Sequence, residues 1–170
     1  MRHDLTIRMR LATIDDLALL QSWDDEPHVI SCDPTDDWSW AEELARSVPW
    51  REQWIAELSG RPIGCLQIID PAEEESHYWG DIEPNLRAID IWIGEESDLS
   101  KGYGTQMMQW AISRCFANDT VKAIIIDPLL SNERAIRFYE RQGFRPVGPR
   151  RFGQDDCLVM RLDRRDHAPG

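Results

Sequence analysis

Residues 89–104, IDIWIGEESDLSKGYG, decide the fold class of this chain. They read as a buried strand, a short acidic loop and a turn with Gly102 and Gly104, followed by a helix with an apolar face. The first amide groups of a helix have no partner within the helix and lie at the positive end of its dipole, so such a turn suits phosphate. An ordinary tight turn is the alternative. The stretch therefore predicts a turn that binds pyrophosphate.

Length and composition predict one domain covering residues 1–170. The chain has 170 residues, 42% of them hydrophobic, and eight tryptophans, which suffices for one well-buried core. Residues 164–170 are expected to be a frayed tail. No apolar run is long enough to span a bilayer, and the first residues have no signal-peptide core, so we expect a cytoplasmic protein without membrane contact.

The cysteines and histidines predict no metal site. They are widely spaced, with no CxxC pair and no ligand spacing among them, which favours free thiols over disulfides or zinc ligands. The residues concerned are Cys32, Cys65, Cys115, Cys157, His3, His28, His77 and His167.

The formal charge of −12 is concentrated in two segments, 24–43 and 70–83, which contain carboxylates but no lysine or arginine. Aromatic side chains are interleaved with these acids, namely Trp23, Trp38, Trp40, Tyr78 and Trp79. Carboxylates and aromatic faces both attract ammonium groups, so the pattern indicates a cationic partner and disfavours nucleic acid. The alternative is that both segments are solvated loops that aid solubility.

Periodicity and turn residues predict an alternating α/β order. Thr13 and Asp16 resemble a capping box, which places a helix after an edge strand at 5–11. The expected elements that follow are a loop at 27–37, a helix from about Asp37, a hairpin of 52–58 and 62–69, strands at 87–93 and 121–126 with a helix between them, a helix at 131–142 closed by Gly143, and a final hairpin ending at 157–162.

Two motifs together carry a resemblance to a known family. The glycine turn and the run SNERAIRFYERQGF at 131–144 resemble the acyl-CoA-binding core of the GNAT acetyltransferase superfamily over residues 50–162. More narrowly, RAID at 87–90 and KGYGT at 101–105 resemble aminoglycoside 6′-N-acetyltransferases. One departure is Leu99, where the superfamily commonly has Gln or Arg.

The resemblance implies an α/β fold with a mixed, mostly antiparallel central sheet and helices on both faces. The sheet is expected to be splayed in the middle, between the strand that carries Asp90 and the strand at 121–126. It implies acetyl-CoA as cosubstrate and a polycationic aminoglycoside as acceptor. The protein is expected to be a monomer or a homodimer.

Asp90 and Tyr139 are the candidate catalytic residues. An alkylamine is mostly ammonium at neutral pH and must lose a proton before it attacks a thioester, and Asp90 stands in an apolar strand where a charged amine would be its partner. Tyr139 keeps its proton at pH 7 and can donate it to the leaving thiolate. The alternatives are a strand aspartate bonded to neighbouring backbone and an ordinary half-buried helix tyrosine.

The remaining site residues follow from the resemblance. Backbone groups of Ile91 and Ile93 are expected to bind pantetheine, and Asn132 to contact the cofactor, although it equally suits a helix cap. The residues expected at the phosphates are Lys101, Gly102, Tyr103, Gly104 and Thr105. Those expected to line the acceptor side are Trp23, Asp25, Trp79, Glu83 and Asp127.

Three interpretations remain open from the sequence. The first is an aminoglycoside 6′-N-acetyltransferase. The second is an acetyltransferase for another amine, such as a polyamine, a siderophore precursor or a protein N-terminus. The third is an acyl-CoA-binding domain without activity, which the joint presence of Asp90 and Tyr139 disfavours. A fold alone does not choose among acceptors.

Overall fold

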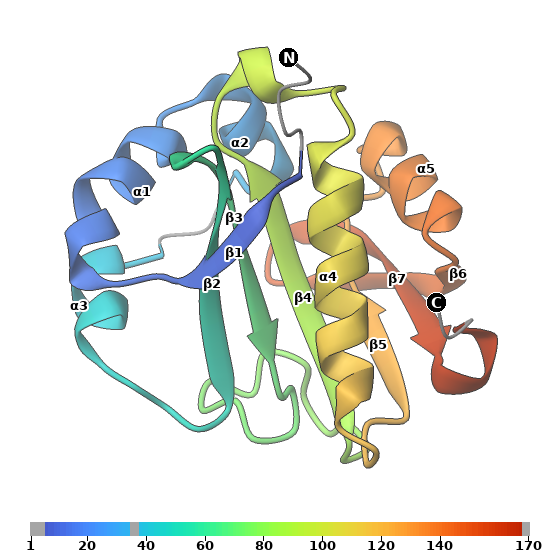
Figure 1. Ribbon diagram of the computed structural model, residues 1–170. Helices are drawn as coiled ribbons and strands as arrows, with labels where there is room; N and C mark the ends of the chain where they lie inside the picture. Colours follow the sequence, from blue (N-terminus) through green and yellow to red (C-terminus); the bar gives the residue numbers. More distant parts are fainter. Residues whose placement is uncertain (1–5, 35–37, 168–170) are drawn as a thin grey trace.

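The computed structural model describes residues 6–34 and 38–167, and its central feature is a sheet with the strand order β1-β2-β3-β4-β5-β7-β6 (Figure 1). All neighbouring strands run antiparallel except β4 and β5, which are parallel. The strands are β1 (Arg8–Leu11), β2 (Arg51–Leu58), β3 (Arg61–Ile69), β4 (Leu86–Ile93), β5 (Ala123–Ile126), β6 (Arg145–Phe152) and β7 (Asp155–Asp163). The helices are α1 (Leu17–Asp24), α2 (Pro27–Cys32), α3 (Trp40–Ala45), α4 (Tyr103–Ala117) and α5 (Glu133–Arg141), with 3-10 turns η1 (Ile14–Asp16), η2 (Glu96–Asp98) and η3 (Arg164–Asp166).

The expected mixed sheet with helices on both faces is confirmed, and so is the capping box that starts the first helix. The Asp16 side chain accepts from the backbone N–H of Thr13 at 2.8 Å, and the Thr13 hydroxyl accepts in return. The expected loop at 27–37 is wrong in its first part, because residues 27–32 form α2. Pro27 at the first helical position is pre-set for a helix start. Leu5, Asp36 and Asp37 lie outside the described residues.

The splay between β4 and β5 is present where it was expected. The two strands pair at three positions, from Leu86↔Ala123 to Ala88↔Ile125. Beyond Ala88, β4 continues to Ile93 with pairing to β3 alone among the described residues, because β5 ends at Ile126. The backbone of β4 after Ala88 therefore faces an opening in the sheet.

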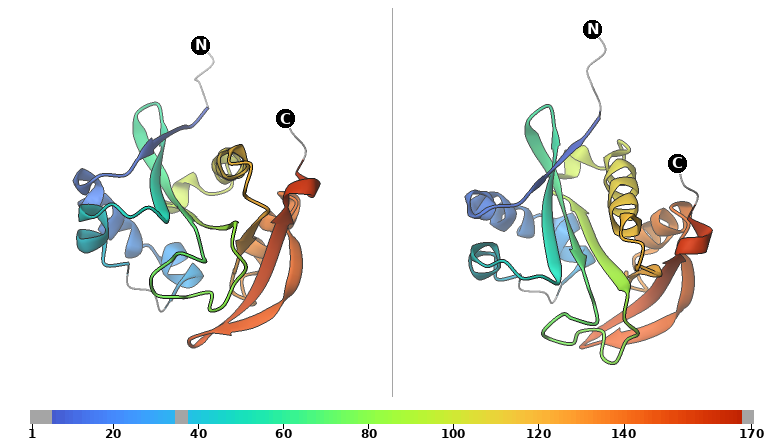
Figure 2. Two further views of the ribbon diagram at one scale, coloured as in Figure 1. Left: turned by 90° about the horizontal axis from the view of Figure 1, so that it is seen from below. Right: turned by 60° about the horizontal axis from the view of Figure 1, so that its bottom comes forward.

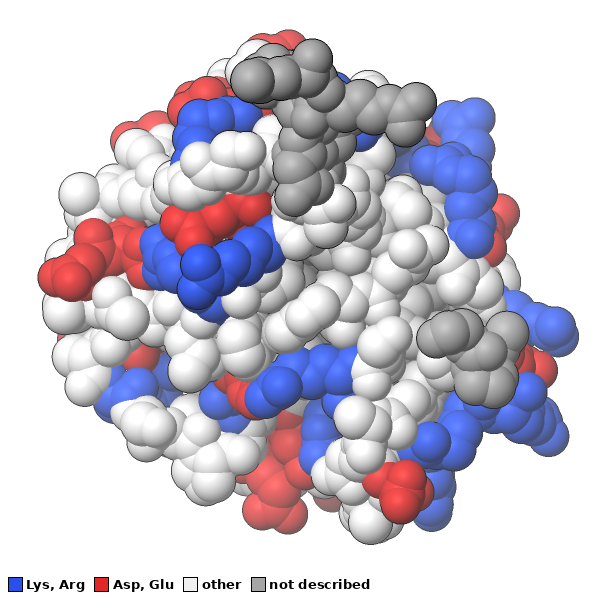
Figure 3. All heavy atoms as spheres, viewed as in Figure 1, with Lys and Arg blue, Asp and Glu red and all other residues white. Residues whose placement is uncertain are grey.

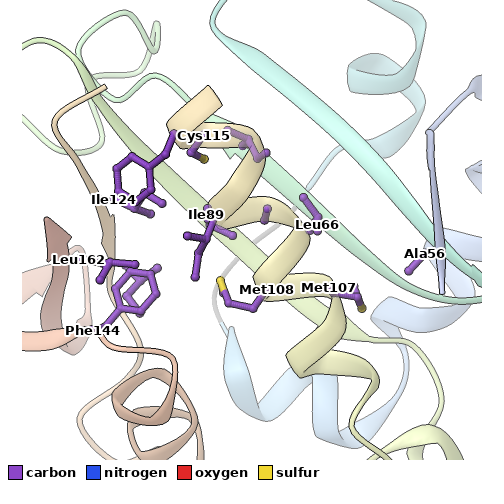
Figure 4. Close-up of a cluster of buried hydrophobic side chains, with 14 of the residues drawn as sticks. Ala56, Leu66, Ile89, Met107, Met108, Cys115, Ile124, Phe144 and Leu162 are labelled. Atoms are coloured by element: carbon purple, nitrogen blue, oxygen red, sulfur yellow. The ribbon is translucent and has the colours of Figure 1, made fainter. Parts of the chain in front are cut away.

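One face of the sheet, called here the α4 face, carries the main hydrophobic core. Helix α4 packs across β3 and β4 with Met107 and Met108 fully buried (Figure 4). Apolar residues of α5, including Ile136 and Phe138, pack against the same cluster. Burying a side chain of this size stabilises the fold by roughly 1.5–3 kcal/mol, so this cluster dominates the stability of the domain.

The other face, called here the opposite face, has two separate coverings. Helices α1 and α3 bury Trp23 and Trp40 against β2 and β3, which forms a tryptophan cluster that Trp92 of β4 joins. The loop 70–85 packs instead with the tip of the β6–β7 hairpin, and the two lie side by side away from α4 (Figure 2). Asp90 stands on β4 between these two coverings.

The C-terminal tail is anchored further than expected. The guanidinium of Arg164 donates to the backbone carbonyls of Phe116, Asn118 and Val121 and lies over the Phe116 ring. His167 stacks on the same ring. The expectation of fraying from residue 164 is therefore wrong for 164–167, because the Arg164 guanidinium satisfies carbonyls at the end of α4 and in the segment after it.

Candidate active site

Asp90 projects from the opposite face, beside the splay. Side chains alternate along a strand, and Ile89 and Ile93 belong to the core under α4. Asp90 therefore shares its face with Ala88 and Trp92, which belong to the two coverings of that face. It is half-buried. An ionised carboxylate in such a seam is favoured by a cationic partner.

Tyr139 approaches the splay from the α4 face. It packs against Phe138 and Phe144 on α5 and the residues that follow. Burial raises the pKa of its hydroxyl, and the negative charge of Asp90 raises it further, as do those of Asp127 and of a thiolate at Cys32. Asp90 and Tyr139 thus lie on different faces of the sheet, and the charge of Asp90 still acts on the Tyr139 hydroxyl. The hydroxyl stays protonated at neutral pH, as a proton donor must.

Asp127 follows β5 directly and forms a short hydrogen bond with Tyr78. The Tyr78 hydroxyl donates to Asp127 Oδ2 at 2.5 Å. Burial raises the pKa of Tyr78, with the charge of Asp127 as the next cause, so the tyrosine stays a donor. Tyr78 stacks on Phe152 of the hairpin tip. This contact fixes loop 70–85 over the end of β5 and places a second carboxylate near the splay.

Asn132 caps α5 and also contacts α2. Its Oδ1 accepts from the backbone N–H of Ala135 at 3.1 Å, and its Nδ2 donates to Cys32 Sγ at 3.5 Å. The cap role proposed from the sequence is therefore present, which leaves the cofactor contact as a prediction. The Cys32 contact brings the end of α2 to the start of α5.

The glycine turn precedes α4 as expected. Gly102 is the N-cap residue and has φ of +82°, in the left-handed region that favours glycine. The loop before it is held by a bidentate pair between Arg61 and the buried Asp98 at 2.8 and 2.9 Å, and the Arg61 hydrogen bonds lower the pKa of Asp98. This pair ties the turn to the β2–β3 hairpin and fixes the direction in which the first amides of α4 point.

Cationic side chains stand near this turn. Lys101 belongs to it and is exposed, and Arg134 of α5 donates a hydrogen bond to the Ser100 hydroxyl. Basic side chains also gather on the side of the molecule where α5 and the C-terminal hairpin lie (Figure 3). The N-terminus of α4 therefore combines free amides with positive charge, which suits an anionic group.

The backbone of β4 beyond Ala88 has a neighbour that the sequence did not reveal. His28 of α2 lies with Nε2 2.8 Å from the carbonyl oxygen of Ile93. Ile91 is half-buried, and its backbone lies along the splay. Helix α2 thus crosses the end of β4, and the carbonyl of Ile93, one of the two residues whose backbone is predicted to bind the cofactor, is engaged by the His28 side chain.

The predicted acceptor residues divide into two groups. Asp127 stands at the splay, whereas Trp23 is 2% exposed and packs so closely that a Cβ on Gly94 would lie 2.0 Å from its ring. Trp79 is 5% exposed and packs on Phe152. Both tryptophans are therefore core residues that border the seam. Large aromatic side chains beside acidic residues are often buried in a core, so their position in the acidic segments did not indicate an acceptor site.

The other two predicted acceptor residues lie on the surface. Asp25 is the exposed residue at the end of α1. Glu83 accepts from Arg161 at 2.7 Å, so part of its charge is compensated. The charges of Asp90 and Asp127 therefore act on the Tyr139 hydroxyl, whereas Asp25 and Glu83 are exposed on the surface.

Comparison with known proteins settles the family. The family model described as an acetyltransferase (GNAT) domain matches residues 13–152. The chain belongs to the GNAT acetyltransferase family. It is 33% identical over 159 residues to the aminoglycoside N(6′)-acetyltransferase type 1 of Klebsiella pneumoniae, and the match covers 84% of this chain and 76% of that protein. It is also 37% identical over 76 residues to the kanamycin resistance protein of Rhizobium radiobacter, which covers 44% of this chain and 70% of the relative.

A solved structure supports the same family. The aminoglycoside acetyltransferase AAC(6′)-Ib in complex with coenzyme A and kanamycin has a TM-score of 0.83 to this structure, at 29% identity and with 95% and 96% of the two chains covered. The resemblance drawn from the glycine turn and residues 131–144 is therefore confirmed.

Sequence reasoning missed four residues of this GNAT site, namely His28, Cys32, Tyr78 and Arg134. Each acts through a contact with a residue distant in the chain, such as Cys32 with Asn132. Only Tyr78 had a sequence signal, as an aromatic residue in the acidic segment. No group of three or more His, Cys, Asp or Glu in the described part of the chain could hold a metal ion. Within the same residues no helix is long and apolar enough to cross a membrane.

A cavity of about 710 Å³ lies elsewhere, at the C-terminal end of α4, between Trp110, Arg114 and Trp50. Its three arginines, Arg51, Arg87 and Arg114, are each paired with a carboxylate. None of the predicted site residues lines it. The splay therefore remains the place where the sequence predicts the chemistry.

Proposed function

We propose that this GNAT acetyltransferase transfers the acetyl group of acetyl-CoA to the 6′-amine of an aminoglycoside. The observation that carries the proposal is that Asp90 and Asp127 stand beside the splay between β4 and β5, where the charge of each raises the pKa of the Tyr139 hydroxyl. Two carboxylates on the opposite face suit a polycationic acceptor. The similarity to an aminoglycoside N(6′)-acetyltransferase and to a structure holding coenzyme A and kanamycin supports the choice of substrates.

Acetyl-CoA is proposed to bind on the α4 face. The first amides of α4, with Lys101 and Arg134 nearby, suit its pyrophosphate. The pantetheine arm would run along β4 towards Ile91, where sheet pairing to β5 has ended. The thioester then reaches the splay from the side of Tyr139, and the amine reaches it from the side of Asp90.

The reaction balances with these two residues. The acceptor amine binds as an ammonium group and first gives one proton to Asp90, which passes it to water. The neutral nitrogen then attacks the thioester carbon, and Asp90 takes the second proton, which the nitrogen loses as the amide forms. The carbon–sulfur bond breaks, and the CoA thiolate takes a proton from Tyr139. The product amide and CoA leave, Asp90 releases its proton to water, and the Tyr139 phenolate takes a proton from water, so that one proton is released per turnover. Holding both reactants at one opening supplies proximity, which is a large part of such a rate enhancement.

The test is thiol release from acetyl-CoA with kanamycin, tobramycin, an aminoglycoside with a 6′-hydroxyl, spermidine and a lysine peptide as acceptors. Turnover with kanamycin and tobramycin but not with the 6′-hydroxyl compound is expected. Turnover with spermidine or the peptide alone would contradict the aminoglycoside assignment and favour another amine. Expression in a susceptible bacterium should raise the kanamycin concentration needed to stop growth.

Asp127→Ala is expected to weaken acceptor binding rather than turnover. Loss of one charged hydrogen-bond partner costs about 1.5–3 kcal/mol, so KM for kanamycin should rise about ten- to a hundredfold, with KM for acetyl-CoA unchanged. Asp127→Asn is the matched variant, because it keeps an oxygen for Tyr78 and removes the charge. Tyr78→Phe removes the hydrogen bond and keeps the charge. Equal KM values in Asp127→Asn and the parent would show that the charge of Asp127 does not bind the acceptor.

Cys32 gives a probe of the cofactor site. It is the exposed cysteine among the four, the others being buried. Desolvation raises the pKa of its thiol, so a maleimide should label it slowly at pH 7 and faster at pH 9. Because Cys32 contacts Asn132, saturating CoA is expected to slow the labelling severalfold, as followed by mass spectrometry. Cys32→Ser is the control for the labelled position. Labelling that CoA leaves unchanged would contradict cofactor binding beside Asn132.

A further inference from the structure

Three polar side chains form a row across the sheet that ends at Asp90. Gln53 of β2 is paired with Gln67 of β3, and Gln67 is paired with Asp90 of β4. Directly opposed residues of antiparallel strands project from the same face, with Cβ atoms about 5 Å apart. The three side chains therefore stand next to one another on the opposite face, and Gln67 is the one adjacent to Asp90.

Gln67 is enclosed to an extent that is unusual for glutamine. It is 2% exposed, and its neighbours along β3 on the same face are Cys65 and Ile69. Cys65 belongs to the tryptophan cluster, and Ile69 packs against the cluster under loop 70–85. The amide thus occupies the seam between the two coverings, which is the seam that opens at Asp90.

The orientation of the Gln67 amide follows from its neighbours. Its Oε1 accepts from Gln53 Nε2 at 2.9 Å, so the oxygen is directed towards β2. The amide is planar, and its NH₂ group lies on the other side, away from β2 and towards β4. The flipped amide would place an oxygen against the Asp90 carboxylate, where two acceptors repel each other. The Asp90 carboxylate and the Gln53 donor therefore favour the same orientation of the Gln67 amide.

The NH₂ group of Gln67 has no hydrogen-bond partner in the described part of the chain. A buried donor without a partner is destabilising, so its retention calls for an explanation. A glutamine side chain is long enough to reach the carboxylate of an opposed aspartate by rotation alone. The Gln67 NH₂ and the Asp90 carboxylate can therefore meet without backbone movement.

We propose that Gln67 is a positioning residue for Asp90, whose carboxylate accepts a hydrogen bond from the Gln67 amide when the acceptor is bound. This inference rests on the proposed role of Asp90 as base. The terminal torsion of an aspartate has no sharp preference, so the donors around its carboxylate decide how that carboxylate is oriented. A donor on one oxygen fixes the other oxygen towards the amine, at the distance of about 2.6–3.2 Å that proton transfer needs. Gln53 in turn holds Gln67.

A double-mutant cycle on kcat tests this dependence. Gln67→Met keeps an unbranched side chain of similar length and removes the donor. It is expected to lower kcat about ten- to a hundredfold with KM for acetyl-CoA unchanged. In the Asp90→Asn background the same change should alter kcat by less than about twofold, because there is then no base to position. Gln53→Met, one strand further away, should give a smaller loss than Gln67→Met.

The outcomes separate this inference from the proposed function. If Gln67→Met lowers kcat by the same factor with Asp90 and with Asn at position 90, Gln67 acts on the acceptor or on the fold, and the inference is wrong. If Asp90→Asn alone keeps full turnover, the proposed base is wrong and the inference falls with it. Thermal unfolding serves as the check on structure. Gln67→Met removes a buried NH₂ group without a partner but also removes the acceptor of Gln53, so Tm should change little. An unchanged kcat in Gln67→Met with intact folding also overturns the inference.

Discussion

Asp90→Asn is expected to lower kcat with kanamycin by about 10²–10⁴-fold, the range that a positioned general base contributes. Asparagine has the shape of aspartate but cannot take a proton, so the amine stays protonated at the opening. The fold should be unchanged, because both side chains accept hydrogen bonds in the same place. Thiol release measured at saturating acetyl-CoA and kanamycin checks the result.

Two controls make the Asp90 result specific. KM for acetyl-CoA should stay close to the parent value, since the cofactor is proposed to bind on the α4 face. Raising the pH should restore part of the lost rate, because an alkylamine with a pKa of about 10 then loses its proton to solvent. Near-parental turnover in Asp90→Asn would remove Asp90 from the chemistry and leave it as a strand residue.

Tyr139→Phe is expected to lower kcat about a hundredfold, at the low end of the range for acid catalysis. The effect is smaller than that of Asp90→Asn because a thiol has a pKa of about 8.5 and leaves readily without full protonation. Phenylalanine preserves the packing against Phe138 and Phe144, so thermal unfolding should change little.

The pH dependence of the parent enzyme gives a second check on Tyr139. Burial raises the pKa of its hydroxyl above the ordinary value of about 10, so the acid form is retained as pH rises. Turnover should therefore show no loss from ionisation of Tyr139 between about pH 7 and 10. A loss that centres below pH 9 and disappears in Tyr139→Phe would contradict this assignment.

Local sequence patterns predicted the turns, whose conformation depends on residues adjacent in the chain. The turn before α4 needs glycine at a left-handed position, and Gly102 supplies it. The β2–β3 hairpin turns at Ser59 and Gly60, both with positive φ, as a two-residue loop requires. Helix α2 was missed because it is short and lies among acids and prolines, where composition favours a loop. Its contacts with Ile93 and Asn132 decide its place.

The sequence by itself determined the family, the glycine turn before α4 and the choice of Asp90 and Tyr139 as candidates, because these depend on residue types at fixed spacing. Tertiary structure decided which aromatic residues are buried in the core and which contact the polar site. Trp23 and Trp79 are buried, whereas the Tyr78 hydroxyl donates a hydrogen bond to Asp127. It also placed Gln67 beside Asp90. The physical reason is that strand register and packing join residues far apart in the chain, and hydrogen bonds and pKa shifts depend on those joined neighbours rather than on sequence spacing.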